Sequence, residues 1–310
     1  MSELPSLQGH EMFETSGLNA VFDALEKAGG QGRIVGGAVR NAVLGEPVHD
    51  IDIATQLLPE QVIEAAKSSG LKAIETGIDH GTVTIVSENN SFEVTTLRRD
   101  VATDGRHATV AYTDDWARDA ARRDFTLNSL YADRHGKVYD PLGGYGDLLA
   151  RIIRFVGDPV SRISEDYLRI LRYFRFFSQY GSETPDPEAM AACTSLRDGL
   201  NQLSRERIGQ EMRKLLLANG AGHTAGLMNE AGVSKVLFGC DLDADLLSRV
   251  IAIDRANGLE ADFHLRLAAG LPMDAERMGE LLRLSRVDEL TVVQIQDCFP
   301  PAPALRDNER

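Results

Sequence analysis

The chain has 310 residues, of which 43% are hydrophobic, and its formal net charge is −14. The length favours about two domains, the composition is that of a globular protein, and no apolar run approaches the roughly 18 residues of a membrane span. An acidic chain also lacks the overall basic character of many nucleic-acid binders. The charge is uneven, however, because residues 98–214 carry 19 Lys and Arg against 18 Asp and Glu.

The cysteine pattern and the N-terminus indicate a compartment. The three cysteines, Cys193, Cys240 and Cys298, are far apart and form no CxxC pair. Residues 1–10 show no basic segment followed by an apolar one, as a secretory signal would. We therefore expect a cytoplasmic protein in a reducing environment.

The first half of the chain alternates short helical and extended patterns. Hydrophobic spacing of three to four residues predicts helices, and runs of β-branched residues predict strands. The predicted helices are 18–28, 38–44 and one that begins at Pro59, and the predicted strands are 33–35, 50–54, 82–86 and 92–96. Residues 98–109 are polar and contain Asp104-Gly105, which predicts a mobile loop with a turn.

The second half is predicted to be helical throughout. The change follows residue 147 and is marked by the turn sequence at 140–144 and the apolar run 152–156. The expected fold class is α+β, with a mixed α/β part followed by an all-helical part.

Asp50 and Asp52 are candidate metal ligands. They alternate with Ile51 and Ile53, and residues two apart on a strand point to the same side. Two neighbouring carboxylates suit Mg²⁺, which is held by a few carboxylates together with substrate phosphates. A DxD sequence alone is common and equally describes a solvated strand face.

A glycine pair lies upstream of these aspartates. Gly36 and Gly37 fall between a predicted strand and a predicted helix, where backbone N–H groups can approach a phosphate, and Arg40 could clamp it. Glycine pairs are also ordinary turns. The order strand, glycine pair, helix, strand with DxD is more specific and predicts a triphosphate cradle beside a metal site, as nucleotidyl transfer requires.

Two arginine-rich segments are candidate nucleotide contacts. In residues 122–128, Arg123 is predicted to contact ribose and phosphates, while Asp124 has an alternative role as a helix cap. In residues 165–178, a helical arrangement places one apolar face against the core. That face comprises Tyr167, Ile170, Leu171, Phe174 and Phe177, and the opposite side carries Arg169, Arg172 and Arg175 with Asp166 at its edge. A solvated basic face is the alternative interpretation.

Asp166 and Arg169 suggest a way to choose a base. Cytosine and adenine both present an exocyclic NH₂ donor beside a ring-nitrogen acceptor. A carboxylate only accepts and a guanidinium only donates, so this pair matches C and A but not G or U. Protein side chains could thus replace a nucleic-acid template.

Taken together, six segments resemble the successive motifs of class II tRNA nucleotidyltransferases, the CCA-adding enzymes. They are GGAVRNAVLGEPVHDIDIAT, ARRDFTLNSLY, DPLGG, RIIRFVGDP, EDYLRILRYFRF and ERIGQEMRKLL, and they cover about residues 33–217. Bacterial poly(A) polymerases share this head. The resemblance implies a nucleotidyltransferase head at 1–147, a helical neck at 148–220 and a helical body or partial tail that binds tRNA at 221–310.

The resemblance also implies an activity and a set of site residues. The expected reaction is template-independent addition of CMP and AMP to the 3′ end of tRNA, with CTP, ATP and Mg²⁺ and without a membrane. The implied roles are metal binding for Asp50 and Asp52, and nucleotide contact for the remaining set of Gly37, Arg40, Arg123, Asp166, Arg169, Arg172 and Arg175. Asn41 replaces the family's usual Asp and Ser129 its usual Ala, and we expect neither to remove the chemistry. The chain also ends early for the family, so the tail that grips tRNA would be reduced or absent.

Three alternatives remain open. A poly(A) polymerase would carry a basic segment after the first motif, whereas residues 75–83 are not basic. A CC-only enzyme would lack a functional loop, whereas residues 98–109 are present. A catalytically dead RNA-binding protein would have lost Asp50 or Asp52. The sequence does not indicate protein partners, oligomeric state or the preferred tRNAs.

Overall fold

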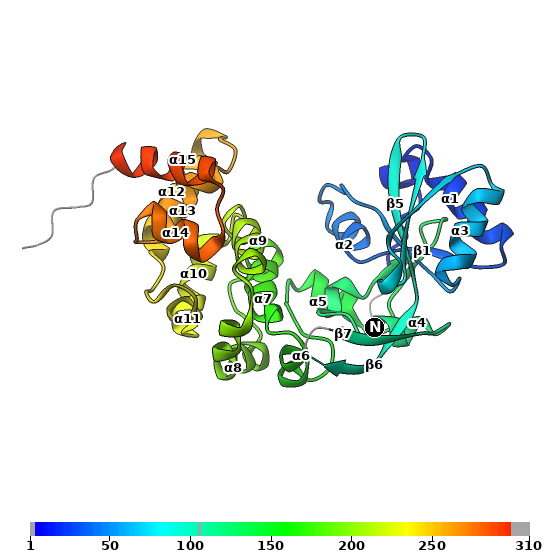
Figure 1. Cartoon of the computed structure of the whole chain (residues 1–310), viewed down its shortest axis with the longest axis horizontal. Coiled ribbons are helices and arrows are strands. Elements are labelled where there is room, and N and C mark those ends of the chain that lie inside the picture. Colours follow the sequence, from blue (N-terminus) through cyan, green and yellow to red (C-terminus); the bar gives the residue numbers. More distant parts are fainter. Residues whose placement is uncertain (1–3, 105–106, 299–310) are drawn as a thin grey trace, which may run out of the picture. The chain divides into compact units, whose positions relative to one another are not determined.

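The computed structural model describes residues 4–104 and 107–298. Of those between 100 and 110 it describes the backbone only. The described residues form two compact units, which divide between residues 158 and 159 (Figure 1). The first contains a mixed sheet with helices and the second is built from helices. The predicted α+β class is therefore confirmed. No helix within the described residues combines the length and apolar character needed to cross a membrane.

The first unit is organised around a seven-stranded sheet in the order β3-β4-β5-β2-β1-β8-β9. Its strands are β1 (Gly32–Val35), β2 (Asp52–Thr55), β3 (Lys72–Gly77), β4 (Thr82–Ser87), β5 (Asn90–Thr96), β8 (Tyr131–Ala132) and β9 (Val138–Tyr139). β2 pairs with β5 in parallel, and the other neighbours are antiparallel. The four predicted strands are present as β1, β2, β4 and β5. β3, β8 and β9 were not predicted, and β8 and β9 are too short for a pattern to be recognised.

Helices pack on the sheet, and one of them begins directly after β1. α1 (Leu18–Lys27) and α3 (Pro59–Ser68) pack against each other and against the β3–β5 part of the sheet. α2 (Gly37–Leu44) follows β1 directly and ends at Gly45 in the left-handed conformation. Phe22, Ile53 and Phe92 are fully buried in this core, and burial of each such side chain contributes about 1.5–3 kcal/mol.

The segment predicted as a loop at 98–109 instead contains two paired strands, so the predicted loop is wrong, while its mobility stays a prediction. β6 (Arg98–Asp104) pairs with β7 (His107–Tyr112) in a two-stranded sheet of its own. Such a ribbon satisfies its backbone groups by its own ladder, and its residues need not show the alternation of a half-buried strand. The expected turn at Asp104-Gly105 falls partly outside the described residues.

The first unit continues beyond the predicted boundary at 147. It contains α4 (Trp116–Ala121), η3 (Thr126–Asn128) and α5 (Gly144–Leu149). The apolar run 152–156 returns to the unit: the Val156 amide donates to the Asp124 carbonyl, and the Thr126 amide to the Arg154 carbonyl. These bonds explain why the first unit closes at residue 158.

The second unit is helical across residues 159–298. In chain order it contains α6 (Pro159–Glu165), α7 (Leu168–Tyr180), α8 (Pro187–Ser195), η4 (Arg197–Gln202), α9 (Arg205–Leu216), α10 (Ala221–Glu230), α11 (Val233–Phe238), α12 (Ala244–Asn257), α13 (Phe263–Gly270), α14 (Ala275–Leu282) and α15 (Arg286–Cys298). α7 packs against α9 and α10. The buried Arg266 pairs with Asp254 and donates to the carbonyls of Leu216 and Ala218, which joins α12, α13 and the end of α9. The expected division between neck and body at 220 stays a prediction.

Candidate functional site

The two candidate metal ligands lie where the chain enters β2. Both Asp50 and Asp52 are exposed, whereas Ile51 and Ile53 between and after them are buried. The predicted alternation is therefore present, although β2 begins at Asp52 and not at Asp50. Two carboxylates face solvent while the intervening isoleucines anchor the segment in the core.

A third carboxylate lies beside them. Glu93 is the neighbour of Asp52 in the parallel pairing of β2 with β5, and residues in register share a face of the sheet. The pKa of Asp52 is raised, first because the surrounding protein desolvates the carboxylate and then because Glu93 and Asp50 lie close. The sequence reasoning missed Glu93, although a charged residue between the apolar Phe92 and Val94 of a predicted strand was a usable signal.

This cluster fits Mg²⁺ by its chemistry. Within 4–104 and 107–298, no three acidic, histidine or cysteine side chains are arranged to hold a metal by themselves. Mg²⁺ does not require such a cage, because it binds one or two carboxylates and completes its shell with water and substrate phosphates. Desolvation is the largest cause of the raised pKa of Asp52, and repulsion from Glu93 and Asp50 adds to it; a divalent cation would relieve that repulsion.

The glycine turn brings Gly36 next to two polar groups. Gly36 has φ +66° and ψ −118°, which favours glycine, and its amide donates to the Leu130 carbonyl. A Cβ at Gly36 would lie 3.7 Å from Arg123 Nη1 and from the Asn128 carbonyl oxygen. Arg123, the predicted ribose and phosphate contact, is therefore a neighbour of Gly36, and Gly37 at the start of α2 lies next to Arg40, the other predicted member of the triphosphate cradle.

Arg40 is held more tightly than the sequence indicated. Its side chain is buried; Nε and Nη2 donate to Asn41 Oδ1, and Nη1 donates to Asn128 Oδ1 at 2.6 Å. Asn41 thus supplies the acceptor oxygen that an Asp at this position would supply. The Nδ2 of its side chain donates to the Pro47 carbonyl. Arg40 joins α2 to η3, and direct contact between Arg40 and a phosphate stays a prediction.

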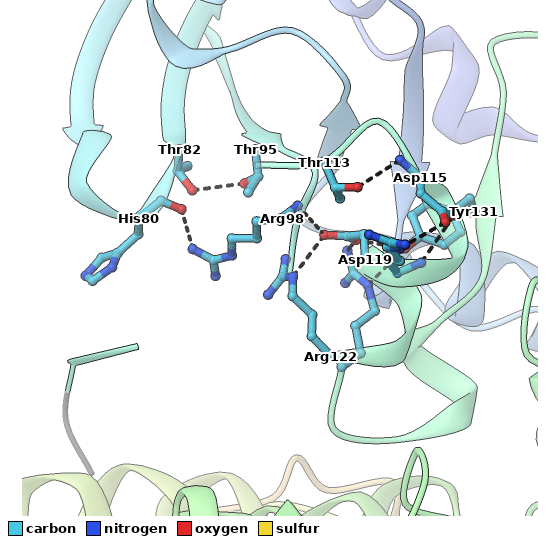
Figure 2. A network of polar contacts seen from close by, with 11 residues as sticks. His80, Thr82, Thr95, Arg98, Thr113, Asp115, Asp119, Arg122 and Tyr131 are labelled. Carbon is cyan, nitrogen blue, oxygen red and sulfur yellow. Dashed lines mark hydrogen bonds and ion pairs between the residues drawn. The ribbon is translucent and has the colours of Figure 1, made fainter. Parts of the chain in front are cut away.

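Arg123 is backed by a buried carboxylate that the sequence reasoning missed. Asp119 on α4 is 1% exposed and accepts from Arg122 Nε, Arg123 Nη2 and the Tyr131 hydroxyl at 2.8–2.9 Å (Figure 2). The amide of Arg98, the first residue of β6, lies 3.3 Å from the same carboxylate. Burial raises the pKa of Asp119, but Arg123, Arg122 and the hydrogen bonds outweigh it, so the pKa lies below its ordinary value. Spacings of three and four residues to the two arginines were the available signal.

Two other residues of this region have local roles. Asp124 accepts from the Phe125 amide and from Asn128 Nδ2. The N-cap of η3 is Phe125 and has no side-chain cap bond, so the capping interpretation of Asp124 is wrong. Ser129 is fully buried, and its hydroxyl donates to the Thr126 carbonyl at 2.6 Å. The hydroxyl has a partner, which is why a serine is accommodated at this position.

In the second unit, Asp166 does not belong to the same helix as Arg169. The predicted continuous helix at 165–178 is wrong, because α6 ends at Glu165 and α7 begins at Leu168. Asp166 lies in the junction, where Oδ1 accepts from the Leu168 amide and Oδ2 from Arg207 Nη2 at 2.6 Å. The Arg169 amide donates to the Asp166 carbonyl, so the two predicted base-reading residues remain one turn apart.

The arginines of α7 have carboxylate partners within the second unit. Arg169 Nη1 donates to Glu165 and to the Arg162 carbonyl. Arg175 Nε lies 2.7 Å from Glu211 Oε2, and Arg172 Nη1 lies 3.9 Å from Glu211 Oε1. Arg172 is 32% exposed and Arg175 only 11%, so Arg172 is more accessible to a ligand. The helix is also buried more broadly than one face, since Tyr173 and Phe176 are buried.

The first unit defines the class of protein. Residues 32–154 match the family described as the poly(A) polymerase head domain, and residues 184–244 match a probable RNA- and SrmB-binding site of polymerase A. The CCA-adding enzyme of Bacillus stearothermophilus has the same fold, with a TM-score of 0.78 and 31% identity over 91% of this chain and 69% of that one. The chain belongs to the family of CCA-adding enzymes.

Curated relatives agree with this assignment. The chain is 39% identical over 285 residues to "CCA tRNA nucleotidyltransferase 1, mitochondrial" of Danio rerio, and 43% identical over 223 residues to its Homo sapiens namesake. These alignments cover 90% and 71% of this chain, and 66% and 51% of the relatives. The chain thus spans about half to two thirds of their length.

Proposed function

We propose that the protein adds CMP and AMP to the 3′ end of tRNA without a template. The terminal 3′-OH attacks the α-phosphate of CTP or ATP and releases pyrophosphate. The single observation that carries this proposal is the cluster of Asp50, Asp52 and Glu93 beside a glycine turn and Arg123, in a chain of the CCA-adding family. The relative from Bacillus stearothermophilus was crystallised with CTP, which supports a nucleotide ligand here.

Asp50 and Asp52 would hold Mg²⁺, and Glu93 would add negative charge to the same surface. When bound, the cation favours the nucleophilic form of the 3′-OH and neutralises charge on the phosphates. The residues themselves contribute position: Ile51 and Ile53 fix the segment, and the β2–β5 register fixes Glu93 relative to Asp52.

Gly36, Gly37 and Arg123 would receive the triphosphate and the sugar. The absence of a side chain at Gly36 leaves the space next to Arg123 Nη1 open. Asp119 holds the other side of the Arg123 guanidinium, which restricts its orientation. Arg40 keeps α2 in place through Asn128 and would act on the phosphates from that position.

Asp166 and Arg169 would select cytosine and adenine by hydrogen bonding to the pairing edges of these bases. Asp166 offers an acceptor and Arg169 offers donors, whereas guanine and uracil would leave both unpaired in a site built for hydrogen bonds. Arg172 and Arg175 would add positive charge to α7, the helix that carries Arg169. Arg172 is the more exposed of the two.

A transcript assay tests the proposed function. A tRNA that ends before CCA is incubated with Mg²⁺ and with CTP, ATP, GTP or UTP separately, and then with CTP and ATP together, and the 3′ ends are sequenced. We expect two C residues with CTP alone, complete CCA with both nucleotides, and no product with GTP or UTP. Long A tracts would indicate a poly(A) polymerase, and arrest at CC with both nucleotides would indicate a CC-only enzyme.

The cytoplasm is the proposed compartment. Cys193 is buried, Cys240 half-buried and Cys298 exposed, and all three are free thiols, as is usual in a reducing environment. Fractionation of cells that express the natural protein tests this: recovery in an organelle instead of the cytosolic fraction would contradict it.

A further inference from the structure

Asp166 is held by a residue from another helix of its own unit. Arg207, near the start of α9, places Nη2 2.6 Å from Asp166 Oδ2, while Asp166 Oδ1 accepts from the Leu168 amide at 3.1 Å. One oxygen is thus fixed by the backbone of α7 and the other by α9. With both oxygens engaged, rotation of the carboxylate about its Cβ–Cγ bond is restricted.

The partner of Asp166 in base choice is fixed separately. Arg169 is bound by Glu165, and Glu165 in turn accepts from the buried Arg162 at 2.6 Å. The acceptor and the donor of the base-reading pair are therefore each fixed by an opposite charge. Each retains hydrogen-bonding capacity, because a carboxylate has about four acceptor sites and a guanidinium five N–H groups.

α9 carries two such partners for the α7 region. Arg207 and Glu211 are four residues apart, which places them on one face of the helix. Arg207 contacts the α6–α7 junction, and Glu211 contacts Arg175 and Arg172 on α7 itself. α9 therefore fixes the junction and the helix with charges of opposite sign.

We propose that Arg207 is a positioning residue that sets the specificity of nucleotide choice by orienting the Asp166 carboxylate. This inference rests on the proposed base-reading role of Asp166. The side chain of Arg207 is 44% exposed and that of Asp166 is 33% exposed. Such surface ion pairs add little stability to the fold. The contribution of Arg207 is therefore geometric: a misplacement of about 1 Å in a reacting or recognising group can cost about 10²-fold.

The test compares Arg207→Ala with Arg205→Ala. Arg205 lies on the same first turn of α9 and is also exposed, so it controls for the loss of one positive charge from this turn. The kcat/KM of all four nucleotides is measured on one tRNA primer, together with the thermal unfolding midpoint. We expect Arg207→Ala to lower kcat/KM for CTP and ATP about 10- to 100-fold while GTP and UTP change far less. Arg205→Ala should keep the wild-type preference.

Rescue and coupling separate positioning from scaffolding. Arg207→Lys should restore part of the preference, because a lysine keeps the charge but not the planar fork. In an Asp166→Ala background, Arg207→Ala should cause no further loss of preference, since residues that act as a unit are not additive. A uniform fall for all four nucleotides, or additive losses in the double variant, would overturn the inference.

The same experiment separates a failure of base reading by Asp166 from a failure of positioning by Arg207. If Asp166→Ala keeps the preference for C and A, the proposed base-reading function itself fails. If Asp166→Ala loses the preference but Arg207→Ala keeps it, only the positioning role of Arg207 is overturned.

Discussion

Asp52 in the first unit and Asp166 in the second have opposite electrostatic surroundings. The pKa of Asp52 is raised, first by desolvation and then by the carboxylates of Glu93 and Asp50, and Arg123 offsets only part of this rise. Asp166 instead forms an ion pair with Arg207, and a second ion pair between Arg169 and Glu165 lies beside it. These surroundings fit the roles proposed above, which are cation binding for Asp52 and hydrogen bonding to a base for Asp166.

The comparison suggests a physical reason for assigning the two carboxylates different proposed roles. A cluster of like charges is costly until a cation binds, and this cost favours metal binding. A carboxylate that is already paired gains little from a metal but has a defined orientation, which hydrogen-bond recognition requires. The following predictions test this division of roles.

The largest effect is expected at the metal ligands. Asp50→Ala or Asp52→Ala should abolish addition of every nucleotide, because two-metal chemistry needs both carboxylates. Single-turnover primer extension at saturating Mg²⁺ measures this loss, and circular dichroism checks the fold. Near-normal turnover in either variant would contradict the assignment of Asp50 and Asp52 as metal ligands.

A loss of selectivity is expected at the base-reading pair. Hydrogen-bonding sites can discriminate by about 10⁴-fold, and Arg169→Ala should shrink this factor mainly by slowing CMP and AMP addition. Asp166→Ala should act in the same direction, and the double variant should cost less than the sum of the two. The ratios of kcat/KM for the four nucleotides measure the effect, and preserved ratios would contradict it.

A smaller, step-specific effect is expected at the β6–β7 hairpin. Shortening it or stiffening it should slow AMP addition more than CMP addition, because one pocket must be reshaped for a larger base and this requires a part that moves. The hairpin begins at Arg98, whose amide contacts Asp119 next to Arg123. Separate rate constants on primers ending in C and in CC test the prediction, and equal losses would refute it.

The smallest effect is a shift in pH dependence. Asp52 must be ionised to hold a cation, and its raised pKa means that activity is lost as the pH falls through that pKa. Glu93→Gln removes one of the like charges, so the pKa of Asp52 should fall and the acid limb of the profile should move to lower pH. The midpoint of the limb is compared with wild type at saturating Mg²⁺. An unchanged midpoint, or one at higher pH, would show that Glu93 does not act on Asp52.

Short-range patterns in the sequence predicted much of the site, and long-range pairing explains what was missed. The alternation around Asp50 and Asp52 and the turn at Gly36 depend on residues close in sequence, and both are present. Glu93 is brought to Asp52 only by the parallel pairing of β2 with β5, which no local pattern encodes. Likewise, the break between α6 and α7 was not predicted because residues 165–178 keep a helical hydrophobic pattern across it.

The most direct test of the central claim compares two isosteric variants, Asp52→Asn and Asp166→Asn, in one assay. Each is given all four nucleotides on a tRNA primer over a range of Mg²⁺ concentrations. We expect Asp52→Asn to lose all activity at every Mg²⁺ concentration. We expect Asp166→Asn to stay active with an unchanged Mg²⁺ requirement but to accept G and U more readily relative to C and A, because an amide can donate as well as accept. A uniform loss across the four nucleotides in both variants would contradict the separation of metal binding from base reading.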